Sequence, residues 1–137
     1  MEIEQSRATG WAAWVLFGGI LLVLLGAVHV CIGFIALVRP ELVAGDRADL
    51  LLPVSLTAIA WVHLVLGLIA LVTGVGLIRG LTWARAVAVQ FAVVAALVNF
   101  AFIQVYPVWS VIAVGLAVLI AWAAAAHGRE VADAYGP

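Results

Sequence analysis

Two histidines inside long apolar stretches are the residues of this chain most able to do chemistry. His29 and His63 occur in two phrases, residues 28–38 and 62–72, that share the pattern V-H-x-x-x-G-x-I-A-L-V at an offset of 34 residues. The chain has only 3 histidines, so a repeated His and Gly is specific. Ionisable side chains within a membrane are costly and often functional. The repeat therefore predicts that the two imidazoles lie in one layer, at a common depth in the membrane.

Three kinds of chemistry suit such a layer. In the simplest, each neutral imidazole forms hydrogen bonds with a neighbouring helix, with Asn99 joining the network, at about 0.6–2 kcal/mol per bond. In the second, His29 and His63 ligate a b-type haem axially, or they bind a quinone headgroup together with Asn99 and Tyr106 or Trp109. The third is a proton relay, but the usual carboxylate partner is missing. We expect no metal site, since zinc takes three or four protein ligands.

Composition places these residues in lipid. The chain has 137 residues, of which 68% are hydrophobic and 9% charged, whereas soluble domains carry about 25% charged residues. A net charge of −1 provides no positive electrostatic potential that would attract nucleic acid. All basic residues are arginine, which favours a GC-rich bacterial genome. Nucleotide loops, H-E-x-x-H and serine elbows are absent, so we predict no enzymatic activity and no catalytic residue.

The elements that must position the histidines are four apolar spans. A spanning helix needs about 20 residues, and the sequence predicts spans at about 11–38, 53–78, 82–105 and 107–126, with Pro53 in the first turn of the second. Short tails, 1–10 and 127–137, flank this single membrane domain. The links at Arg79–Thr82 and Tyr106–Pro107 are tight, so neighbouring spans must be antiparallel. We predict an all-α, up-down bundle of four transmembrane helices.

Arginine placement predicts the orientation in the membrane. The side that holds both termini has four arginines and the opposite side has two, which favours cytoplasmic N- and C-termini in a bacterial plasma membrane. The four are Arg7, Arg79, Arg85 and Arg129, and the two are Arg39 and Arg47.

Small residues recur every seven positions in the first two spans, and this period is typical of a left-handed packing seam. They are Gly19, Gly26 and Gly33, then Ala60, Gly67 and Gly74. Small side chains let backbones approach closely in lipid. Each histidine lies three and four residues from members of the seam, so both should point into the interface. We therefore predict that the first two helices pair directly.

Other polar residues have simpler interpretations. Gln90 and Asn99 lie on nearly opposite faces of the third span, so at least one should contact another helix or subunit. We interpret His127 as a solvated helix-end residue and Cys31 as core filler. Arg85 lies close enough to a span end to anchor the helix at the interface.

Several blocks of the chain resemble a family of small four-span bacterial membrane proteins catalogued as a domain of unknown function. They are residues 10–22, the W-x-H-x-x-x-G block at 61–67, T-W-A-R at 82–85, Asn99-Phe100 and Y-P-x-W-S at 106–110. The resemblance covers nearly all of residues 10–126. It implies the four-span topology and no activity. We expect a structural or accessory protein that packs against itself or a larger membrane complex. The alternative is a small redox module at His29 and His63.

Overall fold

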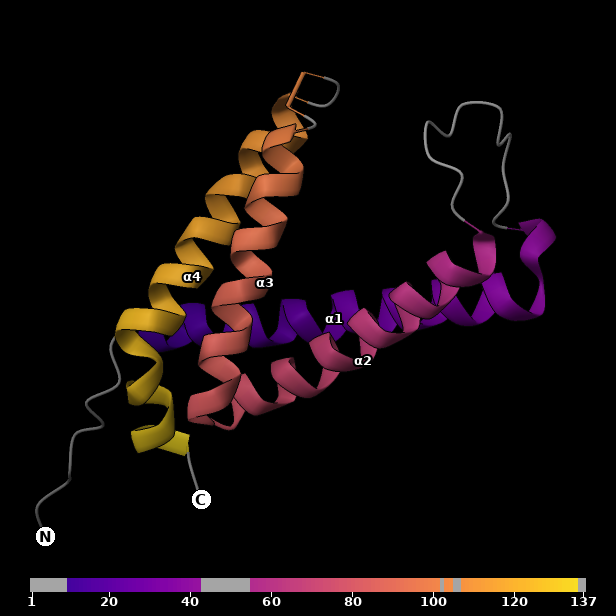
Figure 1. Ribbon diagram of the computed structural model, residues 1–137. Helices are drawn as coiled ribbons and strands as arrows, with labels where there is room; N and C mark the ends of the chain where they lie inside the picture. The colour runs from indigo at the N-terminus through magenta and orange to yellow at the C-terminus, as the bar shows by residue number, and fades with distance from the viewer. Residues whose placement is uncertain (1–9, 43–54, 102, 105–106, 136–137) are drawn as a thin grey trace, which may run out of the picture.

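The computed structural model describes residues 10–42, 55–101, 103–104 and 107–135. The described chain consists of four long helices and one short 3-10 turn, without strands. They are α1 (Gly10–Val38), η1 (Pro40–Leu42), α2 (Leu56–Ile78), α3 (Thr82–Ala101) and α4 (Pro107–Tyr135) (Figure 1). This confirms the predicted all-α bundle of four helices.

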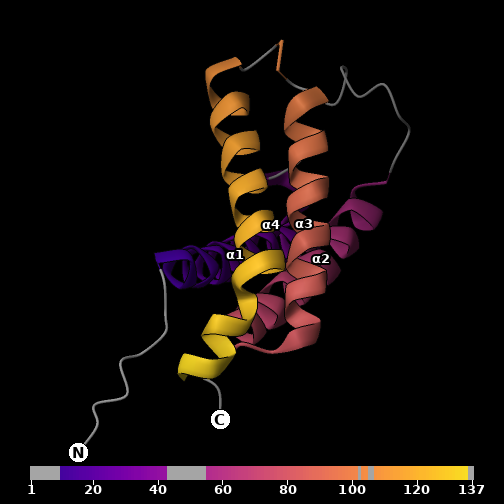
Figure 2. The ribbon, with the colours of Figure 1, turned by 90° about the vertical axis from the view of Figure 1, so that its left-hand side faces the viewer.

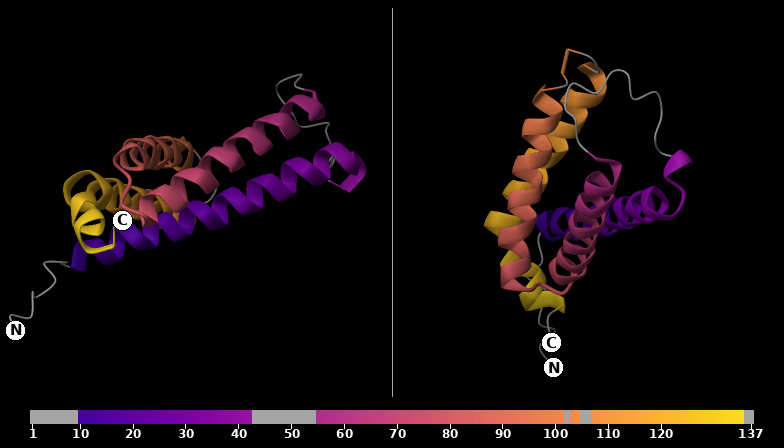
Figure 3. Two further views of the ribbon diagram at one scale, coloured as in Figure 1. Left: turned by 90° about the horizontal axis from the view of Figure 1, so that it is seen from below. Right: turned by 45° about the vertical axis from the view of Figure 1, so that its right-hand side comes forward.

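The helices form two antiparallel hairpins that cross each other. One hairpin is α1–α2 and the other is α3–α4, which lies across the first pair (Figure 2). The crossing is at the N-terminal half of α1 and the C-terminal half of α2. The other halves of α1 and α2 run side by side beyond α3 and α4 (Figure 3). We call this projecting part the outer half of the hairpin.

Local sequence explains where the helices start and stop. The Ser55 hydroxyl caps α2 by accepting from the Ala58 amide at 3.2 Å; Pro53, predicted in the first turn, lies outside the described residues. After α2, Gly80 takes φ +72°, and the Leu81 amide donates to the Gly76 carbonyl at 2.9 Å. This bond, with Gly80 N–H to Leu77 O at 3.1 Å, is the Schellman pattern that ends many helices.

An exposed ion pair follows α1. Arg39 Nε donates to the Glu41 carboxylate at 2.5 Å, and this bond lowers the pKa of Glu41 below its ordinary value. Both side chains are largely in solvent. The pair therefore orients η1 but contributes little to stability.

Helix α4 continues nine residues beyond Ala126, where the predicted span ends. Its last turns pack on the turn between α2 and α3. Val131 is fully buried, and a Cβ added to Gly80 would lie 2.5 Å from Ala132 Cα. One face of this last part of α4, with Gly128 and Val131 buried, thus belongs to the folded core, because it packs on the α2–α3 turn.

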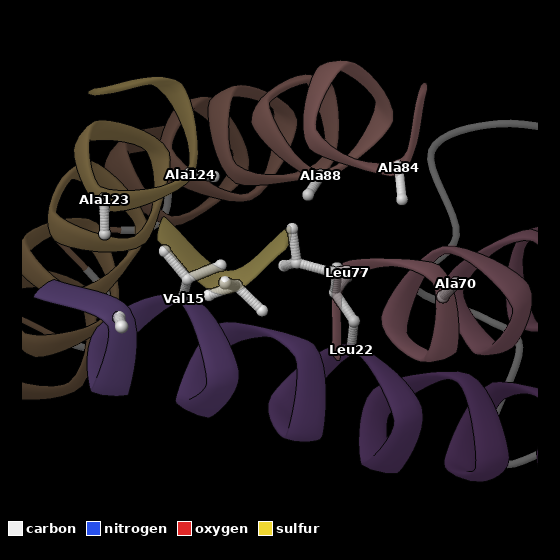
Figure 4. Close-up of a cluster of buried hydrophobic side chains, with 10 residues drawn as sticks. Val15, Leu22, Ala70, Leu77, Ala84, Ala88, Ala123 and Ala124 are labelled. Carbon is white, nitrogen blue, oxygen red and sulfur yellow. The ribbon is translucent and has the colours of Figure 1, made fainter. Parts of the chain in front are cut away.

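The main core lies where the hairpins cross, and small side chains dominate it (Figure 4). All four helices contribute. Its buried members are Ala12, Val15, Leu22, Ala70, Leu77, Ala84, Ala88, Ala123, Ala124 and Val131. Side chains of this size allow helices to approach closely where lipid supplies no hydrophobic driving force.

Candidate functional site: a histidine pair and the adjoining groove

The small-residue seam sets the register of α1 against α2. All six predicted residues are buried in this interface, in the antiparallel pairs Gly19–Gly74, Gly26–Gly67 and Gly33–Ala60. A Cβ added to Gly26 would lie 2.7 Å from the Gly67 carbonyl oxygen, and one added to Gly67 would lie 2.8 Å from the Gly26 oxygen. The backbones themselves are in contact, so neither helix can yield by turning a side chain.

This register relates the two sequence repeats by a local two-fold axis. When one repeat is mapped onto the other by the offset of 34 residues, Gly26 corresponds to Ala60 and Gly33 corresponds to Gly67. Exchanging the repeats therefore turns the Gly26–Gly67 contact into the Ala60–Gly33 contact, and both contacts exist. The same exchange maps His29 onto His63 and His63 onto His29, so this pair is unchanged. The axis accordingly passes between the two imidazoles, which is why they meet.

The imidazoles of His29 and His63 stack against each other. Their centroids are 5.0 Å apart and their planes differ by 25°. Both side chains are half-buried. The site is thus a face-to-face pair of rings in the interface between antiparallel helices.

Among the described residues, the hydrogen bonds of the His29 and Asn99 side chains stay within single helices and do not form the expected interhelical network. His29 Nδ1 donates to the Leu25 carbonyl at 2.9 Å, which assigns the proton to Nδ1 and leaves Nε2 as an acceptor. Asn99 Nδ2 donates to the Ala95 carbonyl at 2.9 Å. His63 Nδ1 is buried without a partner among the described residues. The His29 and Asn99 side chains bond to their own helix because the carbonyl four residues earlier lies within reach of each donor.

The stacked pair does not fit axial haem ligation. Two axial imidazoles must direct nitrogens at one iron from opposite faces of a porphyrin, which would lie between them. Here the ring faces meet directly. Backbone contacts at Gly26–Gly67 and Gly33–Ala60 close the interface on both sides. The arrangement therefore leaves no room for a macrocycle between α1 and α2.

A groove between the α1–α2 hairpin and α3 gathers the other polar residues. It has a volume of about 530 Å³, and its polar lining residues are His29, Gln90 and Asn99. His63 does not line it. An apolar groove of about 310 Å³ lies on the other side of Phe91 and shares Leu25, Phe91 and Ala95 with the first. Of these two adjoining grooves, only the first has polar lining residues.

Gln90 was not among the predicted site residues. Helical periodicity puts Gln90 and Asn99 on nearly opposite faces of α3, yet both line this groove. Only the position of the other hairpin reveals this. Tyr106 and the side chain of Trp109, suggested as further quinone partners, lie outside the described residues.

Two residues lie in environments other than the predicted ones. His127 is half-buried, stacks on Trp11 with centroids 5.2 Å apart, and contacts Glu130 Oε1 through Nδ1 at 2.6 Å. It is not a solvated end residue, because α4 extends past it and packs against α1. Cys31 is exposed rather than core filler, since it faces away from the seam on the outer half of α1.

Fold and site together define the class of this protein. Each of the four helices is long and apolar enough to cross a membrane, so the chain is a multi-pass membrane protein surrounded by lipid. It belongs to the family described as a domain of unknown function (DUF7144), which it matches over residues 14–129. The predicted membership in a family of unknown function is thereby confirmed. No curated protein and no solved structure matches the chain.

Proposed function

We propose that the protein is a non-enzymatic accessory component of a bacterial plasma membrane, with cytoplasmic termini, which binds its partner through a helix face within the bilayer. The partner is a second copy or a larger membrane complex. The observation that carries this proposal is the outer half of the α1–α2 hairpin, which projects beyond α3 and α4 (Figure 3).

The outer half presents large exposed side chains on two closely packed helices. Its own helices are held by backbone contact at Gly33–Ala60, so its surface is preorganised. Phe34 is 61% exposed and Trp61 is 57% exposed. Tryptophan normally gathers at the membrane interfaces, whereas Trp61 lies inside an apolar span. Aromatic side chains that become buried on association carry much of the binding energy of protein interfaces, so an exposed tryptophan inside the span favours a protein partner.

A photocrosslinker placed on this surface tests the proposal. Benzoylphenylalanine at Phe34 or Trp61 should give one discrete cross-linked product in native membranes. The matched control is Val118 on α4, which is 60% exposed and should give only diffuse products. A product of twice the monomer mass identifies a second copy, and another discrete mass identifies a larger complex. Equal diffuse labelling at all three positions would contradict the proposal.

A quinone site is a second candidate, supported by the groove beside Phe91. His29 Nε2 is available to accept a hydrogen bond, and the Asn99 amide keeps one proton to donate. The Asn99 amide can donate to a quinone carbonyl, and His29 Nε2 can accept from a hydroxyl of the reduced quinol form. The adjoining apolar groove suits its tail.

Lipid extraction separates this candidate from the first. Purified protein that holds a quinone should release isoprenoid quinone in stoichiometric amount, detected by mass spectrometry. Asn99→Leu should lower the yield several-fold, whereas Cys31→Ser, on the exposed surface of α1, should leave it unchanged. Equal trace yields from all three proteins would exclude a quinone site.

A further inference from the structure

Arg85 has an unusual environment at the start of α3. Its Nη2 donates to the Thr82 hydroxyl at 3.0 Å, while its Nε is buried and has no acceptor in the part of the chain that the structure describes. Among the described residues, no carboxylate lies within ion-pair distance of Arg85. Burying part of a charged guanidinium without an anion is costly. The arrangement therefore points to an anionic partner that is not a side chain of this part of the chain.

The structure holds Arg85 in place rather than letting it extend freely to water. Its aliphatic stem crosses α4 at Gly128, where an added Cβ would overlap Arg85 Cδ. Gly128 is buried, and any larger residue there would displace the stem. This contact with α4 is an addition to the predicted role of Arg85 as an interfacial anchor.

A groove of about 280 Å³ opens beside the guanidinium, between α3 and α4. Thr82 and Arg85 form its polar end at the beginning of α3. Ala86, Val89 and Ala125 continue it along the helices toward the membrane interior, with Gln90 at the far end. The groove thus changes from cationic to mainly apolar in the direction in which a lipid changes from headgroup to acyl chain.

We propose that this groove binds a phosphate-bearing membrane lipid. The phosphate oxygens accept hydrogen bonds from the Arg85 guanidinium and the Thr82 hydroxyl, and one acyl chain follows the alanine wall. Arginine suits this role because its planar donors contact two phosphate oxygens at once. Basic pockets between transmembrane helices on the cytoplasmic side bind anionic headgroups in the same way. This inference is independent of the proposed accessory function.

Thermal unfolding of the full-length protein in dodecyl maltoside provides the test. Dioleoyl phosphatidylglycerol should raise Tm in a saturable manner, whereas dioleoylglycerol, which lacks the phosphate, should not. Glycerol 3-phosphate at equal concentration should have little effect, since it lacks the chains. If glycerol 3-phosphate stabilises as strongly as the lipid, the site takes free phosphate, and the lipid assignment is wrong.

Variants locate the effect. Arg85→Gln should weaken the apparent lipid affinity about tenfold or more, because it removes a charge-assisted pair of bonds. Arg79→Gln, an exposed arginine at the end of α2, is the matched control and should keep the full shift. Equal losses in both variants would mean diffuse attraction to positive charge and would overturn the proposal.

A further variant covers the case in which Arg85→Gln fails to fold. Ala125 is exposed and lines the groove, so Ala125→Phe should fill the groove while Arg85 stays in place. The variant should fold normally and lose the lipid-dependent rise in Tm. An unchanged rise would show that the lipid binds elsewhere.

Discussion

At the scale of single residues, the glycines of the seam contribute most to the α1–α2 pair. Their role is steric, since at Gly26 and Gly67 the opposing atoms are backbone oxygens and nitrogens that cannot move aside. Each also lets a Cα hydrogen face a carbonyl oxygen, a weak but recurrent contact between close helices. The histidines stack between these contacts and gain their geometry from them.

Gly67→Ala should therefore destabilise the protein by about 1–3 kcal/mol, the usual cost of overpacking. Gly115→Ala in α4 is the matched control, because a Cβ there meets nothing within 4 Å. That variant should be neutral or slightly stabilising, since alanine is the better helix former. Reversible unfolding in mixed micelles, followed by circular dichroism, measures both. A Gly67→Ala protein as stable as Gly115→Ala would refute the described backbone contact.

His63 offers a second prediction at this scale. Its Nδ1 is buried without a partner among the described residues, a situation that costs about 1–3 kcal/mol. His63→Phe keeps a stacked ring and removes the unpaired nitrogen, so the free energy of unfolding should not fall. His63→Ala removes the ring and should lower it. A marked loss of stability in His63→Phe would show that the imidazole nitrogens are bonded in the folded protein.

At the scale of elements, the C-terminal turns of α4 lock the two hairpins together. They cover the α2–α3 turn through Val131 and Ala132, and they bring His127 onto Trp11 of α1. The crossing angle of the hairpins thus depends on residues beyond the predicted fourth span.

Removing residues 127–137 should lower stability by at least about 1.5 kcal/mol, the lower value for fully burying a side chain such as Val131. Deleting only residues 136–137 is the control and should have no measurable effect. Thermal denaturation in detergent compares the two truncations with the full chain. If both behave alike, the last turns of α4 do not hold the hairpins.

At the scale of the whole molecule, the length of α1 relative to the bilayer thickness bears on how the two hairpins cross. Helix α1 has 29 residues and is about 43 Å long at 1.5 Å per residue, well beyond a hydrocarbon core of about 30 Å. Such a helix either tilts or extends its ends into the headgroup regions, which bring the bilayer to about 40–45 Å. Two hairpins that cross can share this inclination, each leaning away from the membrane normal.

The proposed orientation can be measured by cysteine labelling in intact cells. In a Cys31→Ser background, Ala48→Cys between α1 and α2 should react with a membrane-impermeant maleimide, whereas Ser6→Cys should react only after the membrane is permeabilised. The difference follows from the arginine bias, four against two. The reverse pattern would place the termini outside, and the lipid site at Arg85 would then face the outer leaflet.

The sequence by itself determined that lipid surrounds the chain, that four helices form, and that the first two helices pair. Continuous apolar runs can only be helices in lipid, and the seven-residue spacing of Gly and Ala is a local property that any helix preserves. It also brought His29 and His63 together, because the repeat and the antiparallel turn fix their depth. The family resemblance added the same topology.

Only the tertiary structure decided how the hairpins meet. The crossing depends on contacts between residues distant in sequence, such as Gly80 with Ala132 and Arg85 with Gly128, which no periodicity records. It placed both Gln90 and Asn99 in the lining of one groove. It also turned the histidine rings face to face, which removes the room that a porphyrin needs. Side-chain orientation and cavity shape depend on all four helices at once, so local spacing could not predict them.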